Sequence, residues 1–192
     1  MTEHQDQIEA LEREIHAKQA RLSELCRQGE PETVRDYELN GPSGKVQLSS
    51  LFGDRRDLIV VHNMGASCPY CTLWADGFNG MLQHFEDRAA FVVVSPDTPE
   101  AQKKFADGRG WQFRMLSNGD SGFTEAMGYM KEREGKSMPQ PGFSTFHRDD
   151  DGTIRRIAHA GFGPGDPYCG IWHMIGALKD GAGDWQPRYS YA

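Results

Sequence analysis

The sequence has few cysteines, no long apolar run and no excess of positive charge. Four cysteines among 192 residues are too few for a disulfide scaffold. No apolar stretch approaches the roughly 20 residues that span a membrane, and the first residues, MTEHQDQIEALERE, are acidic and polar rather than typical of a signal peptide. Lys and Arg number 21 against 28 Asp and Glu, and the net charge of -7 argues against nucleic acid or an anionic membrane as a partner. We therefore expect a cytoplasmic protein with neither of these partners.

The sequence also lacks the motifs of the common metal sites. A structural zinc site needs four ligands, usually with a second C-x-x-C or an H-x3-5-H pair. Beyond a single C-x-x-C, the other two cysteines, Cys26 and Cys169, are isolated, and Cys26 is interpreted as a bystander thiol. The acidic run at 149–151 lacks the alternating pattern and closing glutamate of an EF-hand loop and predicts a hairpin turn. We therefore expect no metal ion and no bound cofactor.

The chain is long enough for one domain with a substantial core. Its 38% hydrophobic and 26% charged residues are typical of a globular protein. We expect an N-terminal helix in residues 1–28, a possible dimerisation arm, and one α/β domain in 29–181. Residues 182–192 form an aromatic tail, which we expect to lie against a surface of the domain or against a second subunit.

Residues 2–27 have the pattern of a single helix. Thr2 and Gln5 can form a capping box. Apolar residues recur at heptad spacing, with Lys18 as the interruption, at Ile8, Leu11, Ile15, Leu22 and Leu25. Such a stripe either packs on the same domain or forms a short coiled-coil arm for a homodimer. Because three heptads with a polar break are near the lower limit for a coiled coil, both interpretations stay open.

The remaining sequence alternates between strand and helix patterns. Strands are expected at 58–61, 90–95 and 113–117, with β-hairpins at 37–48 and 143–159 and a short helical turn at 49–52. Helices are expected at 68–85, 98–108, 121–134 and 166–181. Strands that alternate with helices, followed by a closing hairpin and helix, predict a three-layer α/β domain around a central mixed sheet.

The strongest chemical signal is a C-x-x-C motif between a predicted strand and a predicted helix. Cys68 and Cys71 flank Pro69 and Tyr70. Residues three apart on a helix have Cβ atoms roughly 5–6 Å apart, and a disulfide joins Cα atoms roughly 4.4–6.8 Å apart. The two cysteines can therefore form and break a disulfide without moving the backbone. This arrangement is the local pattern of a thioredoxin-like dithiol site.

The position of each cysteine predicts its role. Pro69 suits the first helical position, where its missing N–H would have no partner anyway. Cys68 then lies where the free amides and the positive end of the helix dipole converge, which favours the thiolate. Cys71 lies one turn deeper and is expected to be less exposed. We therefore predict that Cys68 is the nucleophile and Cys71 the resolving thiol.

Residues 37–180 resemble a thioredoxin-fold protein of the alkyl hydroperoxide reductase type. The similarity is carried by residues 58–71, by FVVVSPDTPEAQKKFADGRGWQFRMLSN at 91–118 and by PGFSTFHRDDDG at 141–152. More narrowly, HNMGASCPYCTLWADGF at 62–78, with the N-terminal helix and the C-terminal PRYSY, resembles an uncharacterised bacterial family. That family is classed as thioredoxin-like and is predicted to contain dithiol–disulfide oxidoreductases.

The resemblance implies further site residues. Thioredoxin-fold proteins carry a cis-proline beside the dithiol, just before a strand, and Pro141 matches this position better than Pro139. Together with Pro69 and Tyr70, which are the glutaredoxin pair, Pro141 would contact the substrate. His62 falls where thioredoxins place a buried carboxylate that takes the proton of the resolving cysteine. A neutral imidazole can do this near pH 7, and a hydrogen-bonded core histidine is the alternative.

The sequence departs from related families around the dithiol. Peroxiredoxins approach the nucleophilic cysteine through Pro-x-x-x-Thr/Ser-x-x-Cys, whereas the corresponding residues here are Val61 and Gly65. Thioredoxins carry tryptophan where this chain has Ser67. The glutathione-binding Thr-Val-Pro of glutaredoxins is replaced by Pro-Gln-Pro at 139–141. The surroundings of Cys68 therefore differ from those in all three families.

These observations predict a thiol–disulfide oxidoreductase. Cys68 attacks a disulfide of a protein or small-thiol substrate, Cys71 resolves the mixed disulfide, and an external thiol reductant or a reductase restores the pair. One alternative is a thiol-dependent peroxidase that forms a sulfenic acid at Cys68. Another is a non-catalytic binding or redox-sensing protein of the same fold. Cys169 either relays electrons to the pair or is a buried apolar thiol.

Overall fold

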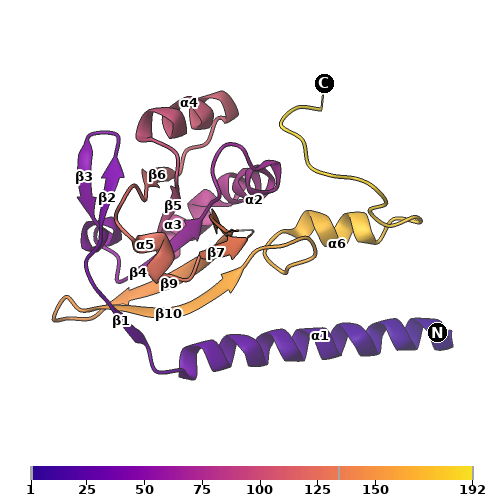
Figure 1. The fold of residues 1–192 in the computed structure, drawn as a ribbon. Coiled ribbons are helices and arrows are strands. Elements are labelled where there is room, and N and C mark those ends of the chain that lie inside the picture. The colour runs from indigo at the N-terminus through magenta and orange to yellow at the C-terminus, as the bar shows by residue number, and fades with distance from the viewer. Residues whose placement is uncertain (1, 134, 192) are drawn as a thin grey trace.

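Strand β4 (Asp57–His62) lies at the centre of the domain because most of its side chains are apolar and buried. The computed structural model describes residues 2–133 and 135–191. Within them β4 pairs in parallel with β5 (Ala90–Ser95) and antiparallel with β9 (Gly142–Arg148). The main sheet has the order β1-β10-β9-β4-β5-β6-β2-β3 (Figure 1). The prediction of an α/β domain with a central mixed sheet is therefore confirmed.

The other strands extend the main sheet on both sides of these three. They are β1 (Glu32–Val34), β2 (Glu38–Gly41), β3 (Gly44–Gln47), β6 (Arg114–Ser117) and β10 (Ile154–Gly161). Both predicted hairpins are confirmed, because β2 pairs with β3 and β9 pairs with β10. Strand β6 pairs in parallel with β5 and confirms the strand predicted at 113–117.

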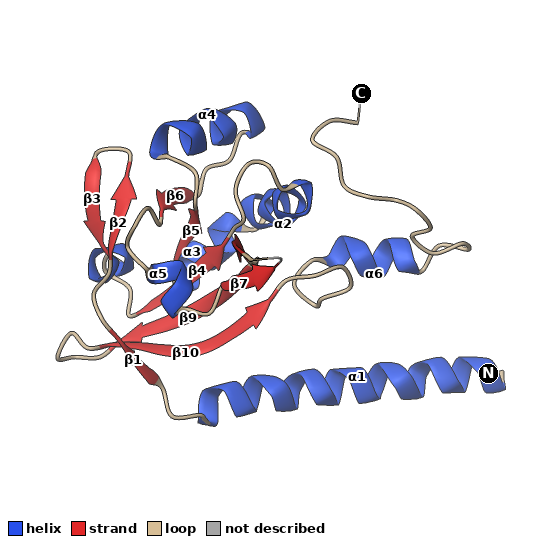
Figure 2. Cartoon of the chain, viewed as in Figure 1, coloured by secondary structure: helices blue, strands red, loops and turns tan. Residues whose placement is uncertain are grey.

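Several helices pack on this sheet and connect its strands, whereas the first helix extends away from it (Figure 2). The helices of the described residues are α1 (Glu3–Gln28), η1 (Leu48–Phe52), α2 (Pro69–Gly80), α3 (Leu82–Arg88), α4 (Pro99–Arg109), α5 (Phe123–Ala126) and α6 (Gly170–Gly176). The predicted start of α4 is confirmed, because the Thr98 hydroxyl accepts a hydrogen bond from Ala101 N at 3.3 Å. In the described part of the chain, no helix has the length and apolar character needed to cross a membrane.

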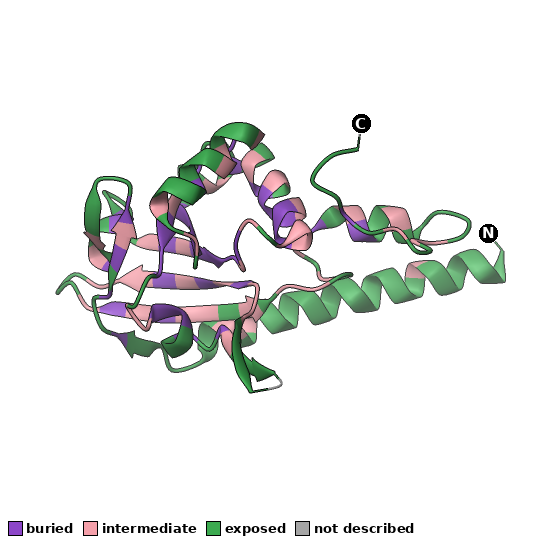
Figure 3. Cartoon of the chain, turned by 45° about the horizontal axis from the view of Figure 1, so that its top comes forward, coloured by how far each residue is buried: buried purple, intermediate pink, exposed green. Residues whose placement is uncertain are grey.

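The side chains of β4 alternate between two apolar clusters. Leu58 and Val60 belong to the cluster that contains η1 and α5, whereas Val61 belongs to the cluster that contains Trp74 and Phe78 of α2. Figure 3 shows buried segments (purple) along the strands and on parts of the helices. The sheet therefore has α2 on one face, and this face is the one that positions the C-x-x-C motif.

Helix α1 buries none of its side chains. Thr2 caps it as predicted, because its hydroxyl accepts a hydrogen bond from Gln5 N at 3.3 Å. The apolar stripe faces solvent, with 59% of Leu11 and 55% of Ile15 exposed, and Figure 3 shows the helix almost entirely as exposed. The helix contacts β10 of its own chain, but this contact leaves the stripe uncovered. Packing of the stripe on the same domain is therefore not observed.

The helix predicted at 121–134 is wrong. Only α5 forms, and it is followed by Gly128 with a φ of +75°. Met130–Arg133 (β7) and Lys136–Pro139 (β8) then pair as a separate two-stranded hairpin, and Glu134 lies outside the described residues. The left-handed conformation of Gly128 ends the helix. Residues 130–133, which are charged and favour helices, therefore do not extend it.

The last helix begins later and ends earlier than predicted. Asp166 does not cap it. The Asp166 carboxylate instead accepts hydrogen bonds from Gly163 N at 2.9 Å and Tyr168 N at 2.7 Å, and it thereby closes a local turn. Helix α6 starts after Cys169 and ends at Gly176, so the predicted end at Gly181 is also wrong.

Candidate active site

The loop between β4 and α2 is held in place by Asp97, which follows β5. Asn63 Oδ1 accepts a hydrogen bond from Gly65 N at 2.8 Å, and Asp97 Oδ2 accepts one from Ala66 N at 2.8 Å. Gly65 has a φ of +102°, and a Cβ at this position would lie 2.9 Å from Asp97 Oδ2. Glycine meets both conditions without strain. The loop is therefore fixed just before Cys68.

Cys68 is the N-cap residue of α2, and Pro69 occupies the first turn as predicted. The Cys68 Sγ accepts a hydrogen bond from Cys71 N at 3.1 Å. The Cys71 thiol, together with the amides of Cys71 and Tyr70, lowers the pKa of the Cys68 thiol from 9.0 to about 7, although burial opposes this shift. A pKa near 7 leaves about half of the sulfur as the reactive thiolate at neutral pH.

Cys71 is a buried thiol in the first turn of the same helix, with 4% of its surface exposed. Its hydrogen bond to Cys68, its burial and the charge of Cys68 all raise the pKa of the Cys71 thiol above the ordinary 9.0. The two sulfurs therefore differ in chemistry, because Cys68 ionises readily and Cys71 keeps its proton. This asymmetry suits a nucleophile and a resolving thiol, and the assignment of these roles stays a prediction.

Aromatic side chains from α6 cover one side of the dithiol helix. Trp172 stacks on Tyr70, with ring centroids 5.9 Å apart, and it also contacts Trp74 at 6.0 Å. Trp74 Nε1 donates a hydrogen bond to Asp166 Oδ2 at 3.0 Å. Sequence reasoning missed the contribution of Trp172 and Asp166, because no local motif links them to a helix so distant in the sequence.

His62 is buried on the sheet face opposite α2, with 2% of its surface exposed. Its Nε2 lies 3.1 Å from Ser144 Oγ, within hydrogen-bond distance, and its ring stacks on Tyr129 with centroids 3.9 Å apart. Burial, with the charge of Arg156, lowers the pKa of His62 well below the ordinary 6.5. The imidazole is therefore neutral at pH 7 but a weaker base than a free histidine, and its participation with Cys71 stays a prediction.

The expectation of a cis peptide bond at Pro141 is wrong. The peptide bonds before Pro141 and Pro139 are both trans. Cis-proline is typically found in a tight turn. The chain has no such turn where it runs from β8 into β9. Pro141 O accepts a hydrogen bond from Phe162 N at 2.9 Å, and the next residue, Gly142, pairs with His62 of β4. Contact between Pro141 and a substrate stays a prediction.

The other two cysteines, Cys26 and Cys169, lie apart from the C-x-x-C motif. Cys68, Cys71, Cys26 and Cys169 are all free, and burial raises the pKa of the Cys169 thiol. A buried, protonated Cys169 fits the apolar interpretation better than the electron relay. Among the residues that the structure describes, no three His, Cys, Asp or Glu side chains are placed to hold a metal ion.

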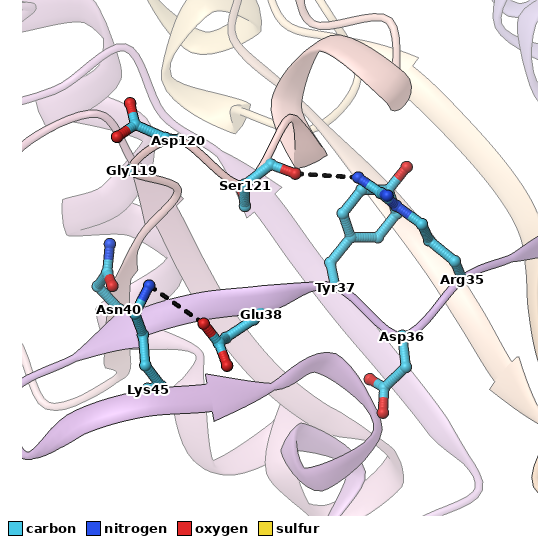
Figure 4. A pocket seen from close by; sticks show the side chains of 9 residues that line it. All are labelled: Arg35, Asp36, Tyr37, Glu38, Asn40, Lys45, Gly119, Asp120 and Ser121. Atoms are coloured by element: carbon cyan, nitrogen blue, oxygen red, sulfur yellow. Dashed lines mark hydrogen bonds and ion pairs between the residues drawn. The ribbon is translucent and has the colours of Figure 1, made fainter.

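A hollow of about 410 Å³ lies away from the dithiol, beside the β2–β3 hairpin (Figure 4). Most of its charged groups already have partners. Arg35 Nη2 donates a hydrogen bond to Ser121 O at 3.2 Å, and Lys45 Nζ lies 3.2 Å from Glu38 Oε1. None of its lining residues is a cysteine, so we do not assign the redox site there.

The fold and the paired sulfurs define the class of the protein, which is a thioredoxin-fold protein with a dithiol at the N-terminal end of a helix. Two features of this chain bear on function. Asp97 holds the loop before Cys68, and the pKa of Cys68 is lowered whereas the pKa of Cys71 is raised. The chain belongs to the family described as "Bacterial protein of unknown function (DUF899)", which it matches over residues 2–188.

Several similar proteins carry peroxiredoxin names. The chain is 28% identical over 132 residues to "Putative peroxiredoxin Rv1608c" of Mycobacterium tuberculosis, a match that covers 68% of this chain and 85% of the relative. The crystal structure of peroxidoxin BcpB from Mycobacterium tuberculosis is similar with a TM-score of 0.53 and 30% identity, over 68% of this chain and 84% of that one. A cysteine-to-serine mutant of PrxQ from Xylella fastidiosa has a TM-score of 0.61 at 17% identity, over 77% and 92% of the two chains, and shows the shared fold.

Proposed function

We propose that the protein is a thiol-dependent peroxidase in which Cys68 reduces a hydroperoxide and Cys71 resolves the oxidised product. The observation that carries the proposal is the Cys68 sulfur at the N-terminal end of α2, where the Cys71 thiol and amide help to lower its pKa to about 7. The similarity to Mycobacterium tuberculosis proteins named as peroxiredoxins supports a hydroperoxide as the oxidising substrate. The C-x-x-C motif alone favours a disulfide as the oxidising substrate. We prefer a hydroperoxide because of the similar proteins.

The reaction uses the two electrons that the dithiol can supply. The Cys68 thiolate attacks the terminal oxygen of the hydroperoxide, the O–O bond breaks, and a proton converts the departing alkoxide to an alcohol. Cys68 becomes a sulfenic acid. The Cys71 thiol attacks this sulfur, the S–O bond breaks, and water leaves as the Cys68–Cys71 disulfide forms. An external thiol reductant then returns two electrons and two protons.

The first turn of α2 supplies the electrostatic part of this mechanism. The amides of Tyr70 and Cys71 point at the Cys68 sulfur and stabilise its negative charge. Two amides of the preceding loop are already engaged, because Gly65 N donates to Asn63 and Ala66 N donates to Asp97. Reactivity at Cys68 therefore depends on the helix end and on Cys71.

A disulfide reductase is the second candidate, and position 65 favours it. Peroxiredoxins carry a hydroxyl side chain at the position that corresponds to Gly65, whereas in this chain a side chain there would be strained at a φ of +102° and would press on the Asp97 carboxylate. In a reductase, Cys68 would attack a substrate disulfide and Cys71 would release the mixed disulfide. Both candidates use the same sulfurs, so the oxidising substrate has to be tested directly.

The test exposes pre-reduced protein to tert-butyl hydroperoxide or to bis(2-hydroxyethyl) disulfide and follows the loss of free thiols. A peroxidase loses two thiols for each hydroperoxide consumed. Cys68→Ser should lose none, and Cys71→Ser should stop at a sulfenic acid that dimedone traps on Cys68. Cys26→Ser is the matched control and should behave as the wild type. Reaction with the disulfide but not with the hydroperoxide would show that the protein is a disulfide reductase and not a peroxidase. Reaction with neither would favour a non-catalytic binding protein.

The partners follow from this chemistry. The disulfide product needs a thiol reductant or a reductase, so we place the protein in the cytoplasm, where such systems keep thiols reduced. The uncovered apolar stripe of α1 supports a homodimer in which the stripes of two copies meet. A helix that buries nothing on its own domain gains its stability from such packing.

A further inference from the structure

A cavity of about 350 Å³ is lined by residues of β7, of the chain that leads into β9, and of β10. Small-molecule sites in proteins have volumes of roughly 300–1,000 Å³, so this cavity is large enough for a small ligand. None of the described residues that line it is a cysteine. The redox sulfurs are therefore not part of it, and a ligand bound there serves a purpose other than the dithiol chemistry.

Arg156 of β10 is a buried charged residue in the lining of this cavity, with 8% of its surface exposed. Its Nη2 donates a hydrogen bond to Met127 O at 2.9 Å, whereas its Nε has no hydrogen-bond partner among the residues that the structure describes. Glu32 Oε2 lies 3.6 Å from Arg156 Nη1, which is longer than a hydrogen bond, and the Glu32 side chain is 57% exposed. A guanidinium withdrawn from water needs an anion with well-formed hydrogen bonds. The protein itself therefore pairs this charge incompletely.

The charged groups that line the cavity are positive. Lys131 of β7 adds a second positive charge, and the described lining contains no aspartate or glutamate. His159 also lines the cavity, but burial and the charge of Arg156 lower the pKa of His159, so its imidazole is neutral at pH 7. The whole chain carries a net charge of -7. A cavity with a local excess of positive charge on such a chain favours an anionic ligand.

Aromatic rings form an apolar part of the lining. Tyr129 and Phe162 both line the cavity, and Arg156 Cζ lies 5.9 Å from the centroid of the Tyr129 ring. The Tyr129 ring stacks on His62 with centroids 3.9 Å apart, and the Phe162 ring stacks on Trp74 of α2 with centroids 6.0 Å apart. These contacts hold both rings in place. The cavity therefore combines a buried positive charge with a rigid apolar wall, and a ligand that fits it has both an anionic and an apolar part.

We propose that this cavity is a binding site for a small organic carboxylate. The carboxylate pairs with the guanidinium of Arg156, whose planar fork matches the geometry of a carboxylate, and Lys131 adds to the attraction. The apolar body of the ligand lies against Tyr129 and Phe162. Because the contact between Arg156 and Glu32 is long and solvated, the ligand carboxylate takes the place of Glu32. The proposal is independent of the peroxidase assignment, because no sulfur takes part in it.

The test titrates the whole wild-type chain with sodium benzoate and follows binding by isothermal titration calorimetry. Binding should saturate at one benzoate per chain. Benzyl alcohol has the ring without the charge, and sodium sulfate has the charge without the ring. Each should bind at least about 10-fold more weakly than benzoate. The proposal would be refuted if benzoate showed no saturable binding, or if either analogue bound as tightly as benzoate.

Arg156→Lys tests the guanidinium, because lysine keeps the positive charge and removes the planar fork. Benzoate should bind this variant about 10-fold more weakly than the wild type, as expected for the loss of a hydrogen bond between charged groups. Arg155→Lys is the matched control. Arg155 is the preceding residue of β10, so its side chain points to the opposite face of the sheet, and it pairs with Asp149. This control should bind benzoate as the wild type does, and wild-type affinity in Arg156→Lys would refute the proposal.

A second variant keeps the test valid if the buried Arg156→Lys does not fold. Lys131 is exposed, so Lys131→Gln should keep the wild-type midpoint of thermal unfolding. It should bind benzoate about 2- to 5-fold more weakly at low salt, as expected for the loss of one solvated charge. This difference should shrink in 1 M sodium chloride, where the Debye length is about 3 Å. Wild-type affinity in Lys131→Gln at low salt would show that charge does not draw the ligand to this cavity and would overturn the proposal.

Discussion

The pKa of about 7 at Cys68 predicts that its alkylation rate crosses that of an ordinary thiol as the pH rises. At pH 7 about half of Cys68 is thiolate, compared with roughly 1% of a thiol whose pKa is 9.0, a ratio of about 50. A lower pKa also weakens the nucleophile, and a Brønsted coefficient of about 0.45 makes the thiolate about 8-fold less reactive over two pKa units. Cys68 should therefore react about 6-fold faster than an ordinary thiol at pH 7 and about 4-fold slower at pH 9.

Alkylation by iodoacetamide, read at each cysteine by mass spectrometry of peptides, measures this profile. N-acetylcysteine serves as the ordinary thiol under the same conditions. The Cys68 rate should rise with pH and level off above about pH 8, because the thiolate is then fully formed. A rate that still rises steeply through pH 9 would show an ordinary thiol and would remove the electrostatic basis of the proposed mechanism.

Cys71→Ala isolates the contribution of the Cys71 thiol, because the backbone amide of residue 71 stays in place. The Cys71 thiol is the largest influence that lowers the pKa of Cys68. A hydrogen bond to a charged group contributes about 1.5–3 kcal/mol, and one pKa unit corresponds to about 1.4 kcal/mol. Since Cys68 is partly exposed, we expect the lower end of this range, so the pKa of Cys68 should rise by about one unit in Cys71→Ala. Cys26→Ala is the control. If the pH midpoint of Cys68 alkylation were the same in Cys71→Ala as in this control, the Cys71 thiol would not be what lowers the pKa of Cys68.

Three further predictions follow from the same structure. His62→Ala should slow disulfide formation by Cys71 without shifting the alkylation midpoint of Cys68, and it should lower the free energy of unfolding in urea by about 2–4 kcal/mol; unchanged turnover would remove His62 from the mechanism. Gly65→Thr should lower the free energy of unfolding by about 2–3 kcal/mol, because a β-branched residue is strained at this φ, and wild-type stability would refute the close approach to Asp97. Leu11→Glu should convert a dimer to a monomer in analytical ultracentrifugation, whereas Ala10→Glu, off the stripe, should not; a monomeric wild type would refute the dimer arm.

The elements that the sequence predicts well are those whose signals are local. Thr98 with Pro99 begins α4, and Cys68 with Pro69 begins α2, because a cap and an N1 proline act within one helical turn. The apolar run of β4 is buried for the same reason, since its pattern is contained in a few residues. The geometry of the C-x-x-C motif could therefore be predicted before any tertiary contact was known.

The elements that the sequence predicts badly are set by contacts between distant residues. Residues 130–139 have side chains that helices and strands both accept, and their hairpin is decided by Gly128 and by the hydrogen bond from Gln140 N to Tyr129 O at 2.8 Å. Asp166 resembles a helix cap in sequence, but its carboxylate closes a turn and binds Trp74. The tail after α6 has no pattern of its own, and its place depends on the hydrogen bond from Arg109 Nη1 to Tyr189 O.

The geometry at Gly65 distinguishes the dithiol loop from the corresponding loop of peroxiredoxins. At a φ of +102° a side chain is strained, and the hydroxyl side chain that peroxiredoxins carry at the corresponding position would press on the Asp97 carboxylate. Gly65 N and Ala66 N already donate to Asn63 and Asp97. The groups described at the Cys68 sulfur are then the Cys71 thiol and the amides of Tyr70 and Cys71. A peroxidase built in this way depends on the first turn of α2, and it should lose efficiency in Cys71→Ala, because the pKa of Cys68 then rises.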